Sequence, residues 1–315
     1  MSGSYGVEGS ACRAEASAYR LGGIAFALAG TIAFAFRPVL IKLGYNAHPV
    51  SATTLLFLRM TLSLPFFLAM AWWVRRSGPA IAPIARRDWL GIVGLGFLGY
   101  YLASLLDFLG LQYISAGIGR LIMFLYPTLV VVLSAIFLNK NPTLKGIAAL
   151  AITYTGIALV LANQISSAQE NRLFVFGALL IFASAACYSV YLVTGSQLVQ
   201  RVGSARFTAY TMIVSAVPAI IQFAVLETPA ALQLPAQLWW IAVLLATACT
   251  VLPVFLVAEA LKRIGANHFA LIGALGPVTT VLADFFLLEG ALSAVQVLGG
   301  ALVISGVLLV SVKRS

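Results

Sequence analysis

The chain repeats part of its own sequence at an offset of 150 residues. Residues 111–160 align without a gap on residues 261–310, and the alignment places Pro127 on Pro277 and Gly156 on Gly306. Leucine-on-leucine matches are expected in an apolar chain, whereas matched prolines and glycines at one offset are not. A repeat of half a chain is far longer than the roughly 20–50 residues of a solenoid unit. It is typical of membrane transporters built from two related halves.

The composition requires a lipid environment. Apolar residues (AVILMFWYC) make up 62% of the 315 residues and charged residues 9%, and the mean hydropathy is +1.03. A soluble domain is about 45–50% apolar and about 25% charged. Ten helices of roughly 20 residues each, the length that spans a bilayer, would use nearly the whole chain. We therefore predict an all-α integral membrane protein with ten transmembrane helices.

Apolar runs and the polar breaks between them predict two sets of five spans. The first set is 21–44, 50–74, 89–111, 117–138 and 143–162, and the second is 173–197, 205–226, 238–261, 267–288 and 293–312. Residues 1–19 are expected to form a disordered cytoplasmic tail, 20–162 the first five-helix repeat and 173–312 the second. Because five is odd, the second repeat begins on the opposite side of the membrane. The two repeats are therefore predicted to be inverted.

The distribution of basic residues supports the inverted arrangement. Cytoplasmic loops collect Lys and Arg. With the N-terminus inside, 14 of the 19 basic residues fall on inside segments: Arg13, Arg20, Arg75, Arg76, Arg86, Arg87, Lys140, Lys145, Arg201, Arg206, Lys262, Arg263, Lys313 and Arg314. Both termini are therefore predicted to be cytoplasmic, in a multi-pass protein of the cytoplasmic (inner) membrane. Orientation in the membrane explains the net charge of +10, so no nucleic-acid partner is expected.

Ionisable residues inside the spans are the candidate substrate-binding site. Arg37, Arg59, Asp107 and Asp284 lie within apolar runs, and Arg120 lies close to an outer helix end. Insertion of such a charge at the centre of a membrane helix costs roughly 2.5–3.5 kcal/mol. These side chains should therefore face protein or a water-filled cavity. Three arginines against two aspartates predict a cavity for an anionic or zwitterionic solute.

The same residues also have a purely structural interpretation. Asp107 and Arg120 flank a short helix hairpin and could form a buried ion pair. Glu259 lies near the inner end of its span and could reach the membrane interface. Asp284 and Glu259 are the candidates for coupling, because a buried carboxylate can exchange a proton or the ammonium of a substrate. Asp284 is the stronger candidate, since the repeat places Ser134 at the equivalent position and requires no charge there.

Prolines and tyrosines complete the predicted cavity. Pro127 and Pro277 occupy equivalent positions in the repeat, and each removes a backbone hydrogen bond from its helix. We expect paired helix bends beside the cavity at these positions. Tyr100 and Tyr126 are candidates for the cavity wall, although aromatic side chains also serve as core or interface residues.

Several short motifs follow one another along the chain. Residues 39–42 precede Pro49 and Arg59, a Ser-Ala-Gly sequence opens the run 115–127, and Leu-Leu-Glu ends the ninth span at 287–289. In this order they resemble the drug/metabolite transporter superfamily, EamA type, over residues 20–312. The end of the fourth span differs, because Asn139-Lys140 stands where the family commonly has Gly-Glu. The resemblance implies alternating-access transport of small metabolites, amino acids or drugs, often outward.

We therefore expect a secondary transporter, and not an enzyme, that exports a small polar metabolite, amino acid or drug. The main alternative is a flippase for a lipid-linked intermediate, and a more distant one is a membrane-embedded enzyme. The only histidines are His48 and His268, and no HExxH motif or aspartate cluster offers a metal site. No cofactor or metal is expected. The expected partners are a small-molecule substrate, protons for coupling and the lipid bilayer, with the protein as a monomer or homodimer.

Overall fold

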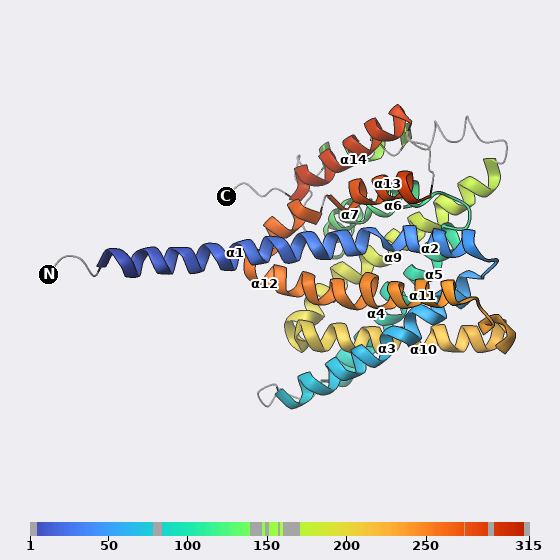
Figure 1. Ribbon diagram of the computed structural model, residues 1–315, viewed down its shortest axis with the longest axis horizontal. Helices are drawn as coiled ribbons and strands as arrows, with labels where there is room; N and C mark the ends of the chain where they lie inside the picture. Colours follow the sequence, from blue (N-terminus) through green and yellow to red (C-terminus); the bar gives the residue numbers. More distant parts are fainter. Residues whose placement is uncertain are drawn as a thin grey trace.

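Helices form all the regular structure of the residues that the structure describes. The computed structural model describes residues 5–77, 84–138, 147–148, 151–156, 158–159, 171–273, 275–288 and 293–311. The α-helices are α1 (Tyr5–Ala35), α2 (Arg37–Ala47), α3 (Ala52–Ser77), α4 (Arg86–Gly96), α5 (Ala103–Gly110), α6 (Ala116–Met123), α7 (Tyr126–Leu138), α9 (Asn171–Val202), α10 (Ser204–Leu226), α11 (Ala236–Ala246), α12 (Leu252–Gly273), α13 (Leu275–Leu287) and α14 (Ala294–Ser311). Two π-helical segments, η1 (Phe97–Leu102) and η3 (Thr247–Val251), and a 3-10 turn, η2 (Pro229–Leu232), complete the bundle (Figure 1).

Six helical segments of the described chain are long and apolar enough to cross a membrane. They are Leu21–Ala47, Ala52–Arg76, Arg86–Gly110, Arg172–Val202, Ser204–Leu226 and Ala236–Val257. Leu275–Leu287 and Ala294–Gly306 are shorter apolar helices. An all-helical, multi-pass membrane architecture is therefore confirmed. The count of ten spans stays a prediction, because much of the predicted span 143–162 lies outside the described residues.

A proline interrupts a helix beside the cavity in the first half. A proline has no N–H to donate, and its ring clashes with the carbonyl group four residues before it. Pro127 stands four residues after Met123, where α6 ends. It then lies in the first turn of α7, where its missing N–H is not needed. Pro277 lies in the first turn of α13, and the bend expected there stays a prediction, because residue 274 lies outside the described residues.

The two π-helical segments also occupy equivalent positions of the repeat. η1 begins at Phe97, and η3 begins 150 residues later at Thr247. A π-helical turn widens an α-helix locally and often occurs at a functional site. Here one segment joins α4 to α5 and the other joins α11 to α12. The π-helical segments therefore repeat along the chain at the same offset of 150 residues as the sequence.

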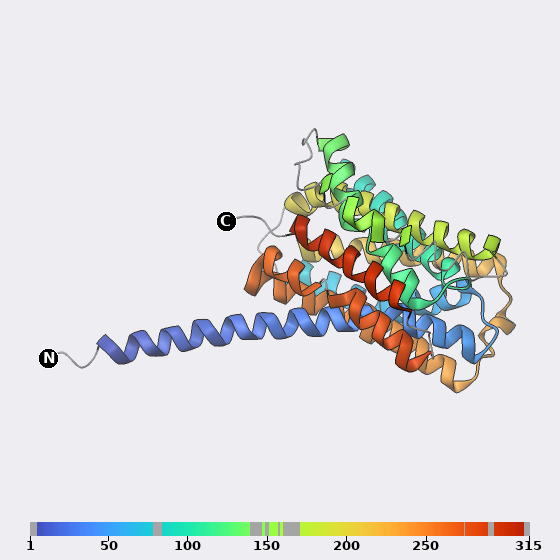
Figure 2. The same ribbon diagram turned by 90° about the horizontal axis from the view of Figure 1, so that it is seen from above.

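Helices of the two halves pack against each other in matched pairs. α1 lies along α12 in both views of the bundle (Figures 1 and 2), and the counterpart helices α9 and α5 also pack together. α3 packs on α10, which is its counterpart in the other half, and α6 packs on α13. Glycine permits close approach of α1 to α12, since a Cβ on Gly30 would lie 3.2 Å from Cγ2 of Val257. The contact between the halves therefore runs through the centre of the molecule.

Two predicted boundaries are wrong. The sequence predicts disorder over residues 1–19, but α1 begins at Tyr5 and projects from the bundle (Figure 2). This segment lacks proline and is rich in alanine, which favours extension of the helix that follows it. The sequence also predicts a break between 261 and 267, but α12 continues to Gly273. A lone glycine, Gly265, is the only strong helix breaker there, and a helix tolerates one at about 1 kcal/mol.

Candidate functional site

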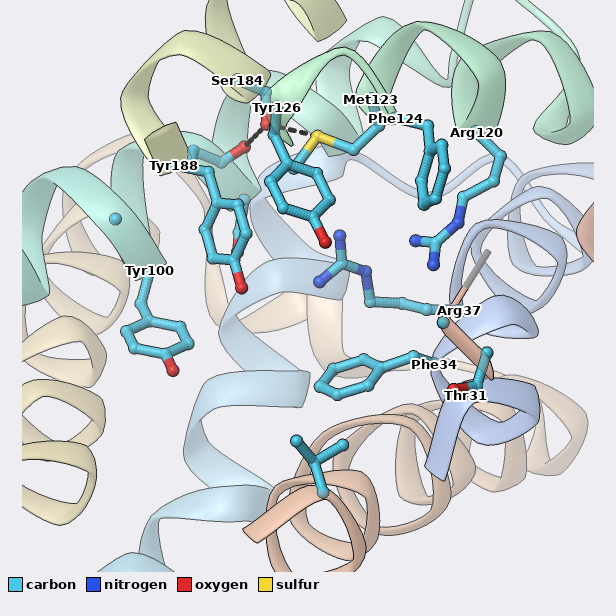
Figure 3. A pocket seen from close by; sticks show the side chains of 15 residues that line it. Thr31, Phe34, Arg37, Tyr100, Arg120, Met123, Phe124, Tyr126, Ser184 and Tyr188 are labelled. Carbon is cyan, nitrogen blue, oxygen red and sulfur yellow. Dashed lines mark hydrogen bonds between the residues drawn. The ribbon is translucent and has the colours of Figure 1, made fainter. Parts of the chain in front are cut away.

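A cavity of about 210 Å³ is lined by residues of both halves. The polar and aromatic residues of its wall are Thr31, Phe34, Arg37, Tyr100, Ser104, Arg120, Phe124, Tyr126, Ser184 and Tyr188. Figure 3 shows the guanidinium groups of Arg37 and Arg120 and the hydroxyl groups of Tyr126 and Tyr188 directed into the same space. Groups that donate hydrogen bonds therefore face the cavity from several helices.

Several residues of the cavity wall lie at or next to breaks in helices. Arg37 is the first residue of α2 and precedes Pro38, at the point where the first apolar run is broken. Tyr100 lies in η1, Arg120 in the last turn of α6, and Tyr126 at the start of α7. Within a membrane, irregular backbone is tolerated where it is buried in protein or lines a water-filled cavity. The breaks in these helices therefore lie at the cavity wall, where irregular backbone is tolerated.

Arg37 forms a buried ion pair with Asp107. Their Nη2 and Oδ2 atoms are 2.9 Å apart, and their side chains are 17% and 5% exposed. The alternative that pairs Asp107 with Arg120 is therefore wrong. The hairpin does bring Asp107 and Arg120 to one small pocket, but the spacing of a hairpin does not determine the direction in which each side chain leaves its helix.

Arg120 is the second cationic group of the cavity wall. Within the described part of the chain it has no ion pair or hydrogen bond, and its buried Nε has no partner. Its guanidinium points into the cavity (Figure 3) and passes Gly276, where a Cβ would lie 3.1 Å from Nη2. A planar guanidinium with free donors is well suited to a carboxylate or another planar anion.

Tyrosines of η1, α7 and α9 form a continuous aromatic wall. The rings of Tyr126 and Tyr188 meet edge to face at 5.3 Å, and Tyr188 stacks on Tyr191 at 5.8 Å. The hydroxyl of Tyr191 lies 3.3 Å from that of Tyr100. These contacts hold the rings in fixed orientations. Tyr100 and Tyr126 line the cavity, as do Arg37 and Arg120.

Sequence reasoning missed Tyr188 and Val257, which also line the cavity. The repeat could have indicated Val257, because it lies 150 residues after the candidate residue Asp107. Tyr188 lies 150 residues after Pro38, which was not a candidate, so the repeat gave no signal for it.

Arg59 is buried behind the cavity wall. It is 2% exposed, and its Nη2 donates a hydrogen bond of 2.8 Å to Oγ of Ser104, which does line the cavity. Its guanidinium also lies over the ring of Phe108, at 5.3 Å from the centroid. The sequence predicted that Arg59 faces the cavity directly, and in this structure Ser104 stands between them. The reason is the rotation of α3, which the sequence does not determine.

The two candidate coupling carboxylates lie away from the cavity wall. Asp284 of α13 reaches the start of α6, where its Oδ2 accepts a hydrogen bond of 3.0 Å from the backbone N–H of Gly117. It therefore links the second half to the first at a helix N-terminus, where a negative charge is favourable. Glu259 pairs with Arg263 one turn further along α12, with Oε1 2.8 Å from Nη2.

The cavity offers no cluster of metal ligands. Over the described ranges, no three His, Cys, Asp or Glu side chains come together. The polar groups of the wall are arginine guanidinium groups and hydroxyl groups of tyrosine, serine and threonine. This arrangement can bind and orient a solute, most favourably one with a negative charge.

The chain matches the EamA-like transporter family twice, over residues 21–162 and over residues 175–312. It belongs to the EamA-like transporter family. It is 29% identical over 284 residues to the "Uncharacterized transporter YcbK" of Bacillus subtilis (strain 168), covering 88% of each chain. It is 30% identical over 227 residues to the "Uncharacterized transporter YyaM" of the same organism, covering 72% of this chain and 74% of the relative. A solved crystal structure with 19% identity has the same fold, with a TM-score of 0.60 over 93% of this chain and 95% of that one.

Membership of the EamA-like family makes this chain a membrane transporter and not an enzyme. The resemblance drawn from the short sequence motifs is therefore confirmed. Each of the two segments that match the family contains one π-helical segment.

Proposed function

We propose that this EamA-like protein is an alternating-access secondary transporter that exports a small anionic or zwitterionic solute across the cytoplasmic membrane. One observation carries the proposal: the cavity lined by both halves, into which Arg37 and Arg120 direct their guanidinium groups. In transporters built from two related halves, the substrate site lies where the repeats meet. A volume of about 210 Å³ is below the roughly 300–1,000 Å³ of drug-sized pockets. It favours a small solute over a lipid-linked intermediate.

The repeated backbone features support a pair of inverted five-helix units. η1 and η3 occupy equivalent positions, as do Pro127 and Pro277. The two units pack against each other, with α3 on its counterpart α10 and with α6 on α13. In this proposal the units rock against each other around the cavity. The π-helical segments and the helix breaks give each unit equivalent points of flexure.

Arg59 and Asp284 have indirect roles in this proposal. Arg59 orients the Ser104 hydroxyl at the cavity wall through its hydrogen bond. Asp284 contributes to coupling through the contact between α6 and α13. When the two units separate at this contact, the carboxylate exchanges the Gly117 N–H for water and can take up or release a proton.

Flux measurements on the purified full-length protein in proteoliposomes test this proposal. We expect saturable uptake of small labelled anions or zwitterions, and faster uptake when a pH gradient is imposed. Arg120→Gln should abolish this flux. Arg172→Gln, which removes an exposed arginine at the start of α9, is the control of equal charge. Flux without saturation would indicate a channel, and movement of labelled lipid would indicate a flippase.

The inverted topology has its own test. A reporter that is active only outside the cell should give a signal in fusions after Gly44 and Gln164, and none after Ser315. Activity at Ser315 would contradict the inverted arrangement of two five-helix units.

A further inference from the structure

The charge balance around the cavity distinguishes an anion from a zwitterion. The cavity wall has two arginines, Arg37 and Arg120. Because Arg37 is paired with Asp107, one positive charge of the wall is left without a counter-charge. Asp107 is engaged with Arg37 at 2.9 Å. No aspartate or glutamate is among the described residues of the cavity wall. The ammonium group of an amino acid would therefore lose its water there without gaining a carboxylate, which is unfavourable.

Arg120 lacks the partner that the other arginines have. Arg37 is paired with Asp107, and Arg59 donates to Ser104. The guanidinium of Arg120 points into the cavity, and its buried Nε has no partner among the described residues. A buried charge without a counter-charge is costly. A bound anion would neutralise this charge, and a carboxylate would match the guanidinium in shape.

The shape and size of the cavity restrict the rest of the solute. Phe34, Phe124, Tyr126 and Tyr188 present ring surfaces to it (Figure 3). A volume of about 210 Å³ is below that of drug-sized pockets, roughly 300–1,000 Å³, so the solute is small. Aromatic side chains favour offset-stacked or edge-to-face contact with a further ring. A flat, apolar body therefore fits this wall better than a hydroxyl-rich one.

We infer that the substrate is a small aromatic carboxylate with a single negative charge and no ammonium group, bound through Arg120. The inference rests on the proposed transport function and narrows its substrate class. Arg120 holds the carboxylate, and the rings of Tyr126 and Tyr188 contact the aromatic body. The ion pair of Arg37 and Asp107 remains intact when the anion is bound.

Binding of labelled benzoate to the purified full-length protein tests the inference. Three compounds serve as competitors. Phenylalanine adds an ammonium group, phenethylamine has an ammonium group in place of the carboxylate, and cyclohexanecarboxylate keeps the carboxylate but lacks the aromatic ring. We expect benzoate to bind at least tenfold more tightly than phenylalanine, and phenethylamine not to compete. Arg120→Gln should weaken benzoate binding at least tenfold, with Arg172→Gln unchanged. Tyr188→Leu should abolish the preference for benzoate over cyclohexanecarboxylate.

The outcomes separate this inference from the proposed function. Competition by phenylalanine at equal or lower concentration than benzoate would overturn the inference, as would unchanged binding in folded Arg120→Gln. If Arg120→Gln does not fold, the competitor series on the wild-type protein decides the question. Flux of phenylalanine in proteoliposomes without flux of benzoate would retain the transporter and reject the substrate class. Tight binding of benzoate without flux of any solute would retain the site and reject the proposed transport.

Discussion

The first half of the chain carries the charged groups of the cavity, and the second half supplies mainly neutral wall and scaffold. Backbone features recur at the offset of 150 residues, as η1 and η3 show. The side chains of the site do not recur. The second half has Cys187, Ala209, Thr250, Val257, Ala270 and Gly276 at the positions equivalent to Arg37, Arg59, Tyr100, Asp107, Arg120 and Tyr126. The two halves therefore share the positions of their π-helical segments but not the charged and aromatic residues of the site.

This difference follows from the cost of buried charge. Helix breaks and π-helical turns are needed twice, because in the proposed cycle each half must move relative to the other. A single small solute needs its counter-charge only once, and a second set of buried arginines would add several kcal/mol of desolvation cost without a ligand to offset it. Gly276, the counterpart of Tyr126, instead leaves room for the Arg120 guanidinium.

The largest effect is expected from the ion pair. Asp107→Val introduces the residue of the second half and leaves Arg37 without a counter-charge, which should lower the free energy of unfolding by about 3–5 kcal/mol and abolish transport. The double variant Arg37→Cys/Asp107→Val makes the first half match the second at both positions. It should recover most of the stability, because apolar residues often replace a buried ion pair at little cost, but it should not transport.

Thermal unfolding in detergent and proteoliposome flux measure both variants. Asp88→Val is the matched control, because its ion pair with Arg201 is at the surface, where the arginine is 55% exposed. Loss of such a pair costs roughly 0–1 kcal/mol. Transport by the double variant would show that the charges of the first half are not part of the site.

Arg59→Met tests whether a buried arginine of the first half acts through the cavity wall. Methionine fills much of the volume but cannot donate to Ser104. Loss of a hydrogen bond to a charged group is worth roughly 1.5–3 kcal/mol, so transport should fall about tenfold to a hundredfold. Ser104→Ala should reduce flux by a similar factor, and the double variant should be no worse than either. Failure of Arg59→Met to fold would instead assign Arg59 a structural role.

Gly99→Ala and Cys249→Ala compare the two π-helical segments at equivalent positions. A Cβ on Gly99 would overlap the ring of Tyr191, and overpacking of this kind costs about 1–3 kcal/mol. Cys249 already carries a buried side chain, so its change to alanine should cost about 1 kcal/mol. Melting temperatures in detergent measure the difference. Equal losses at the two positions would mean that the segments are packed alike.

Substitutions of Asp284 should change the free energy of unfolding only slightly. Asp284→Ala removes the acceptor of the Gly117 N–H, and loss of such a cap costs about 0.5–2 kcal/mol. Asp284→Asn keeps an acceptor and should cost less, but it should lose gradient-driven accumulation while retaining exchange at equal concentrations. Asp284→Ser installs the residue that the first half carries at position 134. Accumulation against a gradient in the Asn variant would remove Asp284 from the coupling mechanism.

Part of the fold and of the site follows from sequence-local rules. A proline ends a helix at the residue four positions before it, so Pro127 determines the end of α6. Apolar length requires membrane helices, and a charge within such a helix must turn inward, as Arg37 and Asp107 do. These outcomes depend on covalent geometry and on the free-energy cost of transfer into lipid. Both are properties of a single segment of the chain and do not depend on its neighbours in the fold.

Only the tertiary structure decided which buried groups meet. The sequence allowed Asp107 to pair with Arg120, and the structure pairs it with Arg37. The sequence placed Arg59 in the cavity, and the structure places it behind Ser104. In each case the answer depends on the rotation of one helix about its axis relative to a neighbour from another part of the chain. That rotation results from the packing of all the helices together, so no local pattern of residues determines it.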